Sequence, residues 1–459
     1  MKSSSFSNSN QSISSLQNQA VLPILIFLGI SGVVYFWAMS NFSNIETFAT
    51  VLALMFFVLS FFSIKVGLIV MAFSMLFSPE ISVGTIGIRS INIRIEDILI
   101  PILVLAWLAR LAIRKEFRLF AHSPINLPIL LLLSLTFLST FWGFAKGWVS
   151  PLPAFFYIFK TMEFFAIFFL VLNYVRTESQ IRLFLAFTLL IVGLIGIYTL
   201  IQVPSVDIFS ERRITAPFEG SPEPATMGGY MAFLLLIIFS IFLYEKGFAK
   251  KWVYALLGVI VFIPFLYTLN RTSYAAFILG MIFIALVEKR KWLTFLILAL
   301  LLASPFLLPE SVKERIAWTW QDAVNPGRDL GVDYSFQERI YAYRKLWNSW
   351  KYSPLIGWGV MSWDMSDSQY ARTLHEIGIL GLGLWLWIFV RLFRLSRWLF
   401  RSLEGGMMKG MALGYQAALL GILLHGFGTI TFYIVRIMEP FWFISGLIVS
   451  LYLIRIKDG

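Results

Sequence analysis

The feature that most constrains this chain is a series of apolar runs, each close to the length of one membrane crossing. A spanning α-helix needs roughly 20 consecutive apolar residues. The runs lie at residues 21–39, 45–63, 64–78, 95–112, 126–143, 154–175, 183–202, 226–245, 253–270, 274–288, 293–308, 373–391, 410–430 and 437–455. Because 64–78 and 274–288 are short enough to be re-entrant or tilted, we predict an all-α, polytopic membrane protein with about 12–14 transmembrane helices.

The composition excludes several other classes of protein. Of the 459 residues, 59% are hydrophobic and only 14% are charged. A soluble domain carries about 25% charged residues and cannot bury so many apolar side chains at this length. A soluble enzyme, a disordered chain and a collagen-like fibre are therefore excluded. The unbroken apolar runs also disfavour a transmembrane β-barrel, whose strands alternate apolar and polar residues.

Basic residues set the expected orientation. Lysine and arginine gather in alternate short loops, at 110–118, 176–182, 246–251, 289–291, 391–409 and 455–457. Cytoplasmic loops carry the excess of these residues, so both termini are predicted to lie on the cytoplasmic side. The net charge of +12 is then explained by inner loops and anionic lipid rather than by nucleic acid.

Four regions follow from this map. Residues 1–20, rich in Ser, Asn and Gln, are predicted to be a disordered cytoplasmic tail. Transmembrane helices with short outer loops occupy 21–308, a large outer loop occupies 309–372, and further transmembrane helices occupy 373–459. Such a long loop is usually functional. We expect a short helix within it, near 335–351, and a second functional outer loop at 203–225.

The residue inventory narrows the chemistry. The chain has no cysteine and three histidines, which disfavours thiolate chemistry and a histidine-rich metal centre. No nucleotide-binding fingerprint occurs. Asp364 and Asp367 do not form the paired-acid motif of nucleotide-sugar transferases. We therefore predict no cofactor and no metal.

Arginines on the outer side are the first functional signal. They are Arg212, Arg213, Arg271, Arg339, Arg344 and Arg372. Arginine is costly inside a bilayer, and its planar, permanently charged group suits phosphate. Several such residues at one level could hold a diphosphate. For Arg212, Arg344 and Arg372, snorkelling or salt bridges to nearby acids explain the position equally well; for Arg271, at a tight turn between apolar runs, function is favoured.

Acids and histidines at the outer end are the second signal. Asp367, His375 and Glu376 precede or begin an apolar helix, where a carboxylate or imidazole could accept a proton from a hydroxyl. An acid in the first turn of a helix is also favoured by the helix dipole, so both interpretations of Glu376 stay open. His425 lies near the outer end of another helix and is more typical of interhelical hydrogen bonding than of catalysis.

Lys160 and Glu163 place two charges inside an apolar run. They are three residues apart and share one helix face, so an internal ion pair is expected. A role for Lys160 on a lipid-phosphate or ion path is the sharper alternative.

The order of several short motifs resembles a known family. They are IRIEDILIP at 93–101, YIFKTMEFF at 157–165, RITAPFEGSPEP at 213–224, TLNRTS at 268–273, SFQERIYAYRKLW at 335–347, SPLIGWGV at 353–360 and YARTLHEIGILG at 370–381. In this order they resemble the O-antigen polymerase and O-antigen ligase superfamily of bacterial membrane glycosyltransferases. Thr215, Ala216 and Glu223 depart from the family's usual Gly and Asn. Ligases usually carry a His-Asn pair where this chain has Asp367 and Ser368, which favours a polymerase.

The resemblance implies a membrane-embedded architecture of the GT-C type in the bacterial inner membrane, with the active site facing the periplasm. It implies a metal-independent reaction on undecaprenyl-diphosphate-linked glycan, with another glycan or lipid A-core as acceptor and a chain-length regulator as a further partner. Arg213, Arg271 and Arg339 would bind the donor diphosphate. Glu376, Asp367 or His375 would act on the acceptor hydroxyl, and the large loop would exclude water.

The sequence is compatible with three functions. The first is polymerisation of O-antigen or exopolysaccharide repeat units. The second is ligation of the glycan to lipid A-core or a protein. The third, from a different class, is a transporter that flips lipid-linked sugar, which would place charges along a central path rather than at one end.

Overall fold

The computed structural model describes residues 44–79, 81–86, 89–114, 121–206, 214–218, 223–289, 291, 294–295, 299, 302–303, 310, 312–314, 343–363 and 368–458. The chain divides into two compact units. Unit 1 comprises Met1–Met71 and Ile95–Leu119, and unit 2 comprises Ala72–Arg94 and Phe120–Gly459. Each unit is described by itself.

Unit 1 contains α2 (Asn44–Phe62), the first half of α3 (Ile64–Phe77) and α4 (Glu96–Arg114). Helix α4 begins with two acids, Glu96 and Asp97, at the helix end where negative charge is favoured. Gly67 lets α3 approach its neighbours closely, since a Cβ there would lie 2.5 Å from the Leu103 side chain.

Unit 2 holds most of the helices. They are α5 (Asn126–Ala145), α6 (Pro151–Tyr174), α7 (Glu178–Gln202), α8 (Pro224–Tyr244), α9 (Phe248–Leu266), α10 (Arg271–Glu288), α14 (Gln369–Ser402), α15 (Gly406–His425) and α16 (Val435–Asp458), with short 3-10 helices η1 (Val203–Ser205) and η2 (Thr431–Tyr433). Among the described residues, nine helices are long and apolar enough to cross a membrane. The predicted all-α, polytopic membrane fold is confirmed.

One small hairpin was not predicted from the sequence. Strand β1 (Ile81–Ile86) pairs antiparallel with β2 (Arg89–Ile93), with Ile81 opposite Ile93 and a register irregularity between Ser82 and Gly84. The hairpin lies between two apolar runs, where only a short loop was expected. The sequence runs 21–39 and 293–308 fall wholly or mostly outside the described residues.

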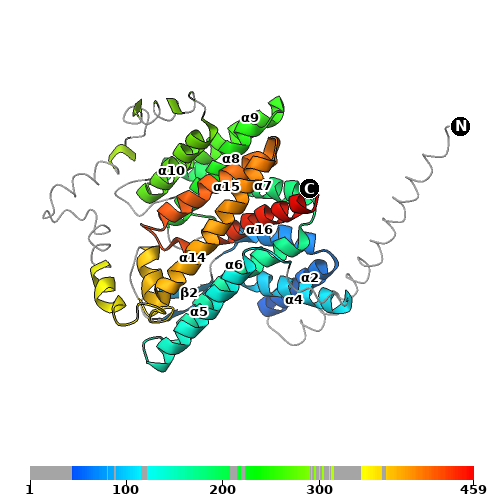
Figure 1. Cartoon of the computed structure of the whole chain (residues 1–459). Helices are drawn as coiled ribbons and strands as arrows, with labels where there is room; N and C mark the ends of the chain where they lie inside the picture. Colours follow the sequence, from blue (N-terminus) through cyan, green and yellow to red (C-terminus); the bar gives the residue numbers. More distant parts are fainter. Residues whose placement is uncertain are drawn as a thin grey trace. The chain divides into compact units, whose positions relative to one another are not determined.

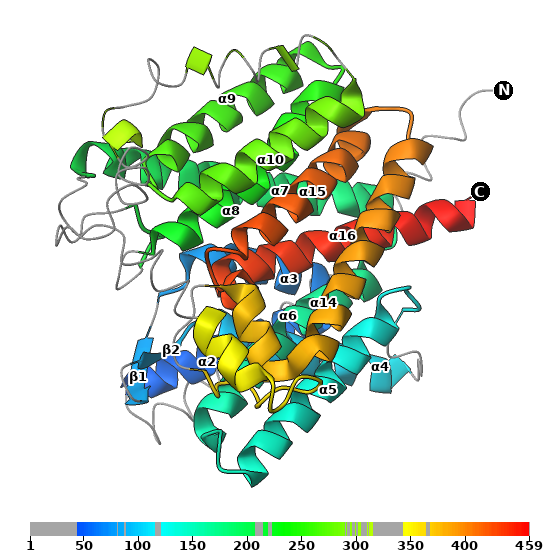
Figure 2. The same ribbon diagram turned by 60° about the vertical axis from the view of Figure 1, so that its left-hand side comes forward.

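Helices α8, α10 and α15 lie side by side in both ribbon views (Figures 1 and 2). Gly229 near the start of α8 meets His425 at the end of α15, and Gly410 near the start of α15 meets Ile241 near the end of α8. These two helices are therefore antiparallel. Helix α10 runs parallel to α8, because its first turn, at Ser273, packs against Gly228.

Helices α6 and α16 run parallel. The Tyr157 and Tyr433 rings lie 5.5 Å apart, where α6 approaches the residues just before α16. Farther along both helices, Phe165 contacts Trp442 at 4.8 Å. Helix α14 begins beside the end of α15, where the Gln369 N–H donates to the Gly426 carbonyl. Thus α6, α8, α10, α14 and α16 all begin at one end of unit 2, which we call the site face.

Candidate active site at the start of α14

Helix α14 is broken near its start. Gly378 has φ 68° and ψ −171°, which takes the backbone out of the helical conformation for one residue. The break leaves carbonyl groups of the preceding turn available, and the segment 353–359 bonds to them. The N–H groups of Trp358 and Gly359 donate to the carbonyls of His375 and Glu376 at 2.8 and 2.9 Å. The segment therefore packs closely against the interrupted helix.

Two glycines make this close packing possible. A Cβ on Gly378 would lie 2.2 Å from the Leu355 carbonyl oxygen, and a Cβ on Gly357 would lie 2.5 Å from the Glu376 backbone. Both residues also have positive φ, a region that glycine enters at little cost. The glycines of the SPLIGWGV sequence (353–360) and of the EIG sequence (376–378) therefore allow these two segments to pack against each other. We call this contact the joint.

The Glu376 carboxylate lies at this joint and is fully buried. One oxygen, Oε1, accepts from Arg372 Nε at 2.9 Å and from the Met361 N–H at 3.0 Å. The other, Oε2, accepts from the Tyr433 hydroxyl at 2.7 Å. Three donors converge on this buried group, as a buried carboxylate requires.

Arg372 is the ionic partner of Glu376 and is itself buried, with 2% of its side chain exposed. Its guanidinium lies over the rings of Tyr433 and Tyr157, at 4.3 and 5.1 Å from the centroids, and NH2 contacts the Met361 sulfur at 3.0 Å. Aromatic faces stabilise a cation by their quadrupole. The salt bridge anticipated for Arg372 is present.

Burial raises the pKa of the Tyr433 phenol well above its usual value, and the negative charge of Glu376 raises it further. Tyr433 therefore stays neutral and keeps its proton as a donor to Glu376. Neither Tyr433 nor Tyr157 was singled out from the sequence, because an uncharged aromatic residue gives no signal in a chain so rich in them.

His375 precedes Glu376 but has different surroundings. Its Nδ1 lies 3.1 Å from the Ser349 hydroxyl, at the end of the helical residues 343–350. The Trp358 ring stacks on the imidazole at 5.6 Å, and the Trp363 ring meets it edge-on at 4.3 Å. The His375 side chain thus packs within the 343–363 segment, whereas the Glu376 side chain bonds Met361 of this segment and also Arg372 and Tyr433.

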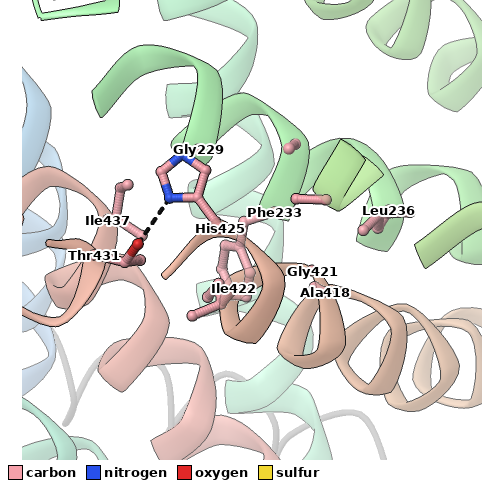
Figure 3. A pocket seen from close by; sticks show the side chains of 11 residues that line it. Gly229, Phe233, Leu236, Ala418, Gly421, Ile422, His425, Thr431 and Ile437 are labelled. Atoms are coloured by element: carbon pink, nitrogen blue, oxygen red, sulfur yellow. Dashed lines mark hydrogen bonds between the residues drawn. The ribbon is translucent and has the colours of Figure 1, made fainter. Parts of the chain in front are cut away.

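His425 joins a second polar chain at the site face (Figure 3). Its Nδ1 lies 2.8 Å from the Thr431 hydroxyl, and its Nε2 lies 3.1 Å from the Ser273 hydroxyl. Ser273 in turn donates to the Asn270 side chain at 2.8 Å. The predicted interhelical hydrogen bonding of His425 is confirmed. A small, mostly apolar cavity beside the ring is lined by residues such as Gly229, Phe233 and Ile437.

Arg271 is the first residue of α10 and is partly buried. The preceding Asn270 caps the helix, with its side chain accepting from the Ser273 N–H at 2.8 Å. The cap and the His425 chain meet at Ser273, two residues after Arg271. The turn that carries Arg271 is therefore fixed by buried and partly buried hydrogen bonds.

The ion pair predicted within α6 is confirmed, with Lys160 Nζ 3.3 Å from Glu163 Oε2. Two further buried charges occur on α16, Arg436 and Glu439. The parallel packing of α6 against α16 places Lys160 and Glu163, in the third and fourth turns of α6, at the level of the first turns of α16, which carry Arg436 and Glu439. No role was predicted for Arg436 from the sequence, although a charge beside an apolar run could have singled it out.

Four predicted site residues lie outside the described residues: Arg212, Arg213, Arg339 and Asp367. Arg344 is exposed within the helical residues 343–350. Of the predicted site residues that are described, Arg372 and Glu376 contact each other directly. Arg271 and His425 are linked through Ser273, and Lys160 lies one turn of α6 below Tyr157.

A family model matches the part of the chain that holds much of this site. Residues 263–386 match the family model described as O-antigen ligase. The match covers Arg271, the 353–360 segment and the Arg372–Glu376 pair, and it ends before His425 and α16. A comparison with curated proteins found no match. The match supports, for residues 263–386, the O-antigen polymerase and ligase superfamily that the motifs predicted, whose members are glycan-transferring enzymes.

Proposed function

We propose that the protein is a glycosyltransferase of surface polysaccharide assembly, which polymerises undecaprenyl-diphosphate-linked repeat units at the periplasmic face of the inner membrane. The main support is the buried Arg372–Glu376 pair inside the segment that matches the family. Charges buried in a membrane protein are costly and usually serve function. The Arg372–Glu376 pair lies near the start of α14, at the site face, whereas a flippase would spread such charges along a path.

In this proposal the acceptor hydroxyl attacks the anomeric carbon of the donor sugar. A bond forms between the acceptor oxygen and that carbon, and the bond from the carbon to the diphosphate oxygen breaks. Arg213, Arg271 and Arg339 bind the diphosphate and stabilise the negative charge that it gains. The hydroxyl proton passes to Glu376, or to Asp367 or His375 just before it in the sequence. The loop 309–372 excludes water that would compete as acceptor.

The Glu376 carboxylate is closely restrained by its hydrogen bonds. Its Oε1 accepts two hydrogen bonds and its Oε2 accepts one from Tyr433, so an acceptor hydroxyl would have to reach the second lone pair of Oε2 in a fully buried site. Its steady role is to hold Arg372 and Tyr433 in place. Removal of the Glu376 carboxylate would therefore release both Arg372 and Tyr433, whereas removal of one donor would leave the carboxylate with its other hydrogen bonds.

The ligase reaction is the second candidate, because the matching family model is described as O-antigen ligase. The sequence favours polymerase, since Asp367 and Ser368 occupy the positions of the ligases' His-Asn pair. Deletion of the gene followed by gel analysis of surface glycan separates the two reactions. Loss of a polymerase leaves single repeat units on the core, and loss of a ligase leaves bare core with lipid-linked polymer.

The direct test uses purified full-length protein and a lipid-linked repeat unit. We expect longer glycan to form without added nucleotide, which a flippase would not produce. Arg271→Ala and Arg339→Ala should each abolish most elongation, whereas Arg397→Ala, an exposed arginine toward the other end of α14, should leave it intact. Unchanged elongation in both active-site variants would contradict the donor site.

A further inference from the structure

We propose that the residues joining α15 to α16 position three separate parts of the site, through Thr431, Tyr433 and Arg436. We call residues 426–436 the α15–α16 turn. The inference rests on the proposed function, because the parts it positions carry the proposed substrate-binding residues. The turn lies outside the segment that matches the family model.

The first contact is made by Arg436, which is almost completely buried. Its NH1 donates to the Leu76 carbonyl at 2.7 Å, and its NH2 donates to the carbonyls of Ser78 and Pro217 at 3.4 and 3.5 Å. Arginine inside a membrane protein commonly pairs with backbone carbonyls in this way. The guanidinium therefore joins α16 to two chain segments that are far away in sequence.

Pro217 belongs to the segment 214–218, which directly follows Arg213. A second anchor holds the same segment, because the Gln202 side chain exchanges two hydrogen bonds with the Thr215 backbone, at 3.0 and 3.2 Å. Ala216, which lies between these anchors, and Ile214, which precedes them, are both buried. Arg436 thus fixes the chain within four residues of a proposed diphosphate ligand.

The second contact is made by Tyr433, whose hydroxyl donates to Glu376. The neighbouring Phe432 N–H donates to the Gln369 side chain at 2.8 Å, and the Gln369 N–H donates to the Gly426 carbonyl at 2.9 Å. The turn is therefore bonded to the first residue of α14 at two places, Gly426 and Phe432. This holds the Arg372–Glu376 pair at a fixed distance from α16.

The third contact is made by Thr431, which bonds His425, and through it Ser273 and the capped turn that begins with Arg271. One turn thus contacts the 214–218 segment, the polar chain that reaches the Arg271 turn, and the Glu376 cluster. Since an error of about 1 Å in the placement of catalytic groups can cost roughly 100-fold in rate, a shared anchor is a direct way to keep three separate elements aligned.

The kinetic test compares three variants with chemically matched controls. Arg436→Gln, Tyr433→Phe and Thr431→Val each remove one contact of the turn. Their controls are Arg455→Gln at the other end of α16, Tyr415→Phe, which removes a buried hydroxyl bonded to Ser445, and Thr188→Val, which removes a buried hydroxyl bonded within α7. All are measured in purified full-length protein with the lipid-linked repeat.

Because Arg436 and Thr431 position donor-binding elements, their variants should raise the donor KM about tenfold or more while kcat changes less. Tyr433→Phe acts on the Glu376 cluster and should mainly lower kcat. Arg436→Lys should restore part of the donor affinity lost in Arg436→Gln, because an ammonium group can still donate to carbonyls. The controls should keep both constants within about twofold of wild type.

A spectroscopic measurement tests the anchor without relying on activity. The chain has no cysteine, so Phe218→Cys introduces a single thiol on an exposed side chain of the anchored segment. A nitroxide at this position should become more mobile in electron paramagnetic resonance when Arg436→Gln is added. It should not change with Arg455→Gln.

The outcomes separate the inference from the proposed function. If Arg271→Ala and Arg339→Ala leave elongation unchanged, the proposed function fails, yet the label still reports whether Arg436 holds the 214–218 segment. If the label mobility does not respond to Arg436→Gln, the positioning role of Arg436 is wrong whatever the kinetics. If the variants of the turn lower kcat and donor affinity no more than their controls, the whole inference is overturned.

Discussion

Arg372 Nε and Glu376 Oε1 lie 2.9 Å apart just before the break in α14, and both side chains are almost fully withdrawn from solvent. A buried pair of this kind is not a simple source of stability, because the desolvation of two charges offsets their attraction. What the pair gives is a fixed geometry: the carboxylate also holds Tyr433 and the Met361 backbone.

Removal of either charged partner of the Arg372–Glu376 pair should destabilise the protein. Arg372→Met and Glu376→Gln should each lower the free energy of unfolding by about 3–5 kcal/mol, because the remaining polar group is left buried with fewer partners. The double variant should lose less than the sum of the two. Thermal unfolding in detergent measures this, with Arg182→Met as the control, since its pair with Glu178 is largely exposed and worth about 1 kcal/mol or less. Additive losses would contradict the coupling.

Gly378 should tolerate no side chain. A Cβ would overlap the Leu355 carbonyl and would also have to occupy φ 68°, so Gly378→Ala should lower the yield of folded protein sharply. Gly383 lies five residues later in the same helix, with open space where a Cβ would lie. Gly383→Ala should be neutral or stabilising by up to about 1 kcal/mol. Size-exclusion profiles measure the yield of folded protein for the two variants. Similar yields would contradict the close packing of Gly378 against Leu355.

The hydrogen bonds of His425 to Thr431 and Ser273 should stabilise the folded protein as well as position the Arg271 turn. His425→Ala leaves the Ser273 and Thr431 hydroxyls without this buried partner, and we expect a loss of about 2 kcal/mol in the free energy of unfolding. His122→Ala, at an exposed histidine, is the matched control and should change little. The melting temperatures of the two purified variants are compared. Equal melting temperatures would show that the hydrogen bonds of His425 add nothing to stability.

The buried Tyr433 phenol should give a particular response to alkaline pH. Its pKa is raised by burial in the folded protein, so the stability it contributes is fully present below the ordinary tyrosine pKa of about 10 and falls as pH rises above that value. The difference in unfolding free energy between wild type and Tyr433→Phe should therefore be constant from about pH 7 to 9 and shrink above about pH 10. A difference that stays flat through about pH 11 would argue against a buried phenol.

Much of the scaffold could be predicted from local sequence because a bilayer imposes a simple rule. Each crossing needs a long apolar helix, and such runs are visible without knowing how they pack. The Lys160–Glu163 pair was predictable for a related reason, since residues three apart on one helix always face the same way. The β1–β2 hairpin escaped because a short antiparallel pair is decided by contacts between two segments, not by either segment alone.

The sequence by itself determined the class of this protein and the family of residues 263–386, because hydropathy and short motifs are properties of consecutive residues. Only the tertiary structure decided that Gly357 and Gly378 belong to one joint, that Glu376 bonds Tyr433, and that Arg436 reaches Pro217. The partners in the last two contacts are separated by 57 and 219 residues. Their physical cause is the need of each buried charge for a partner, and the chain can satisfy that need only after the helices have packed.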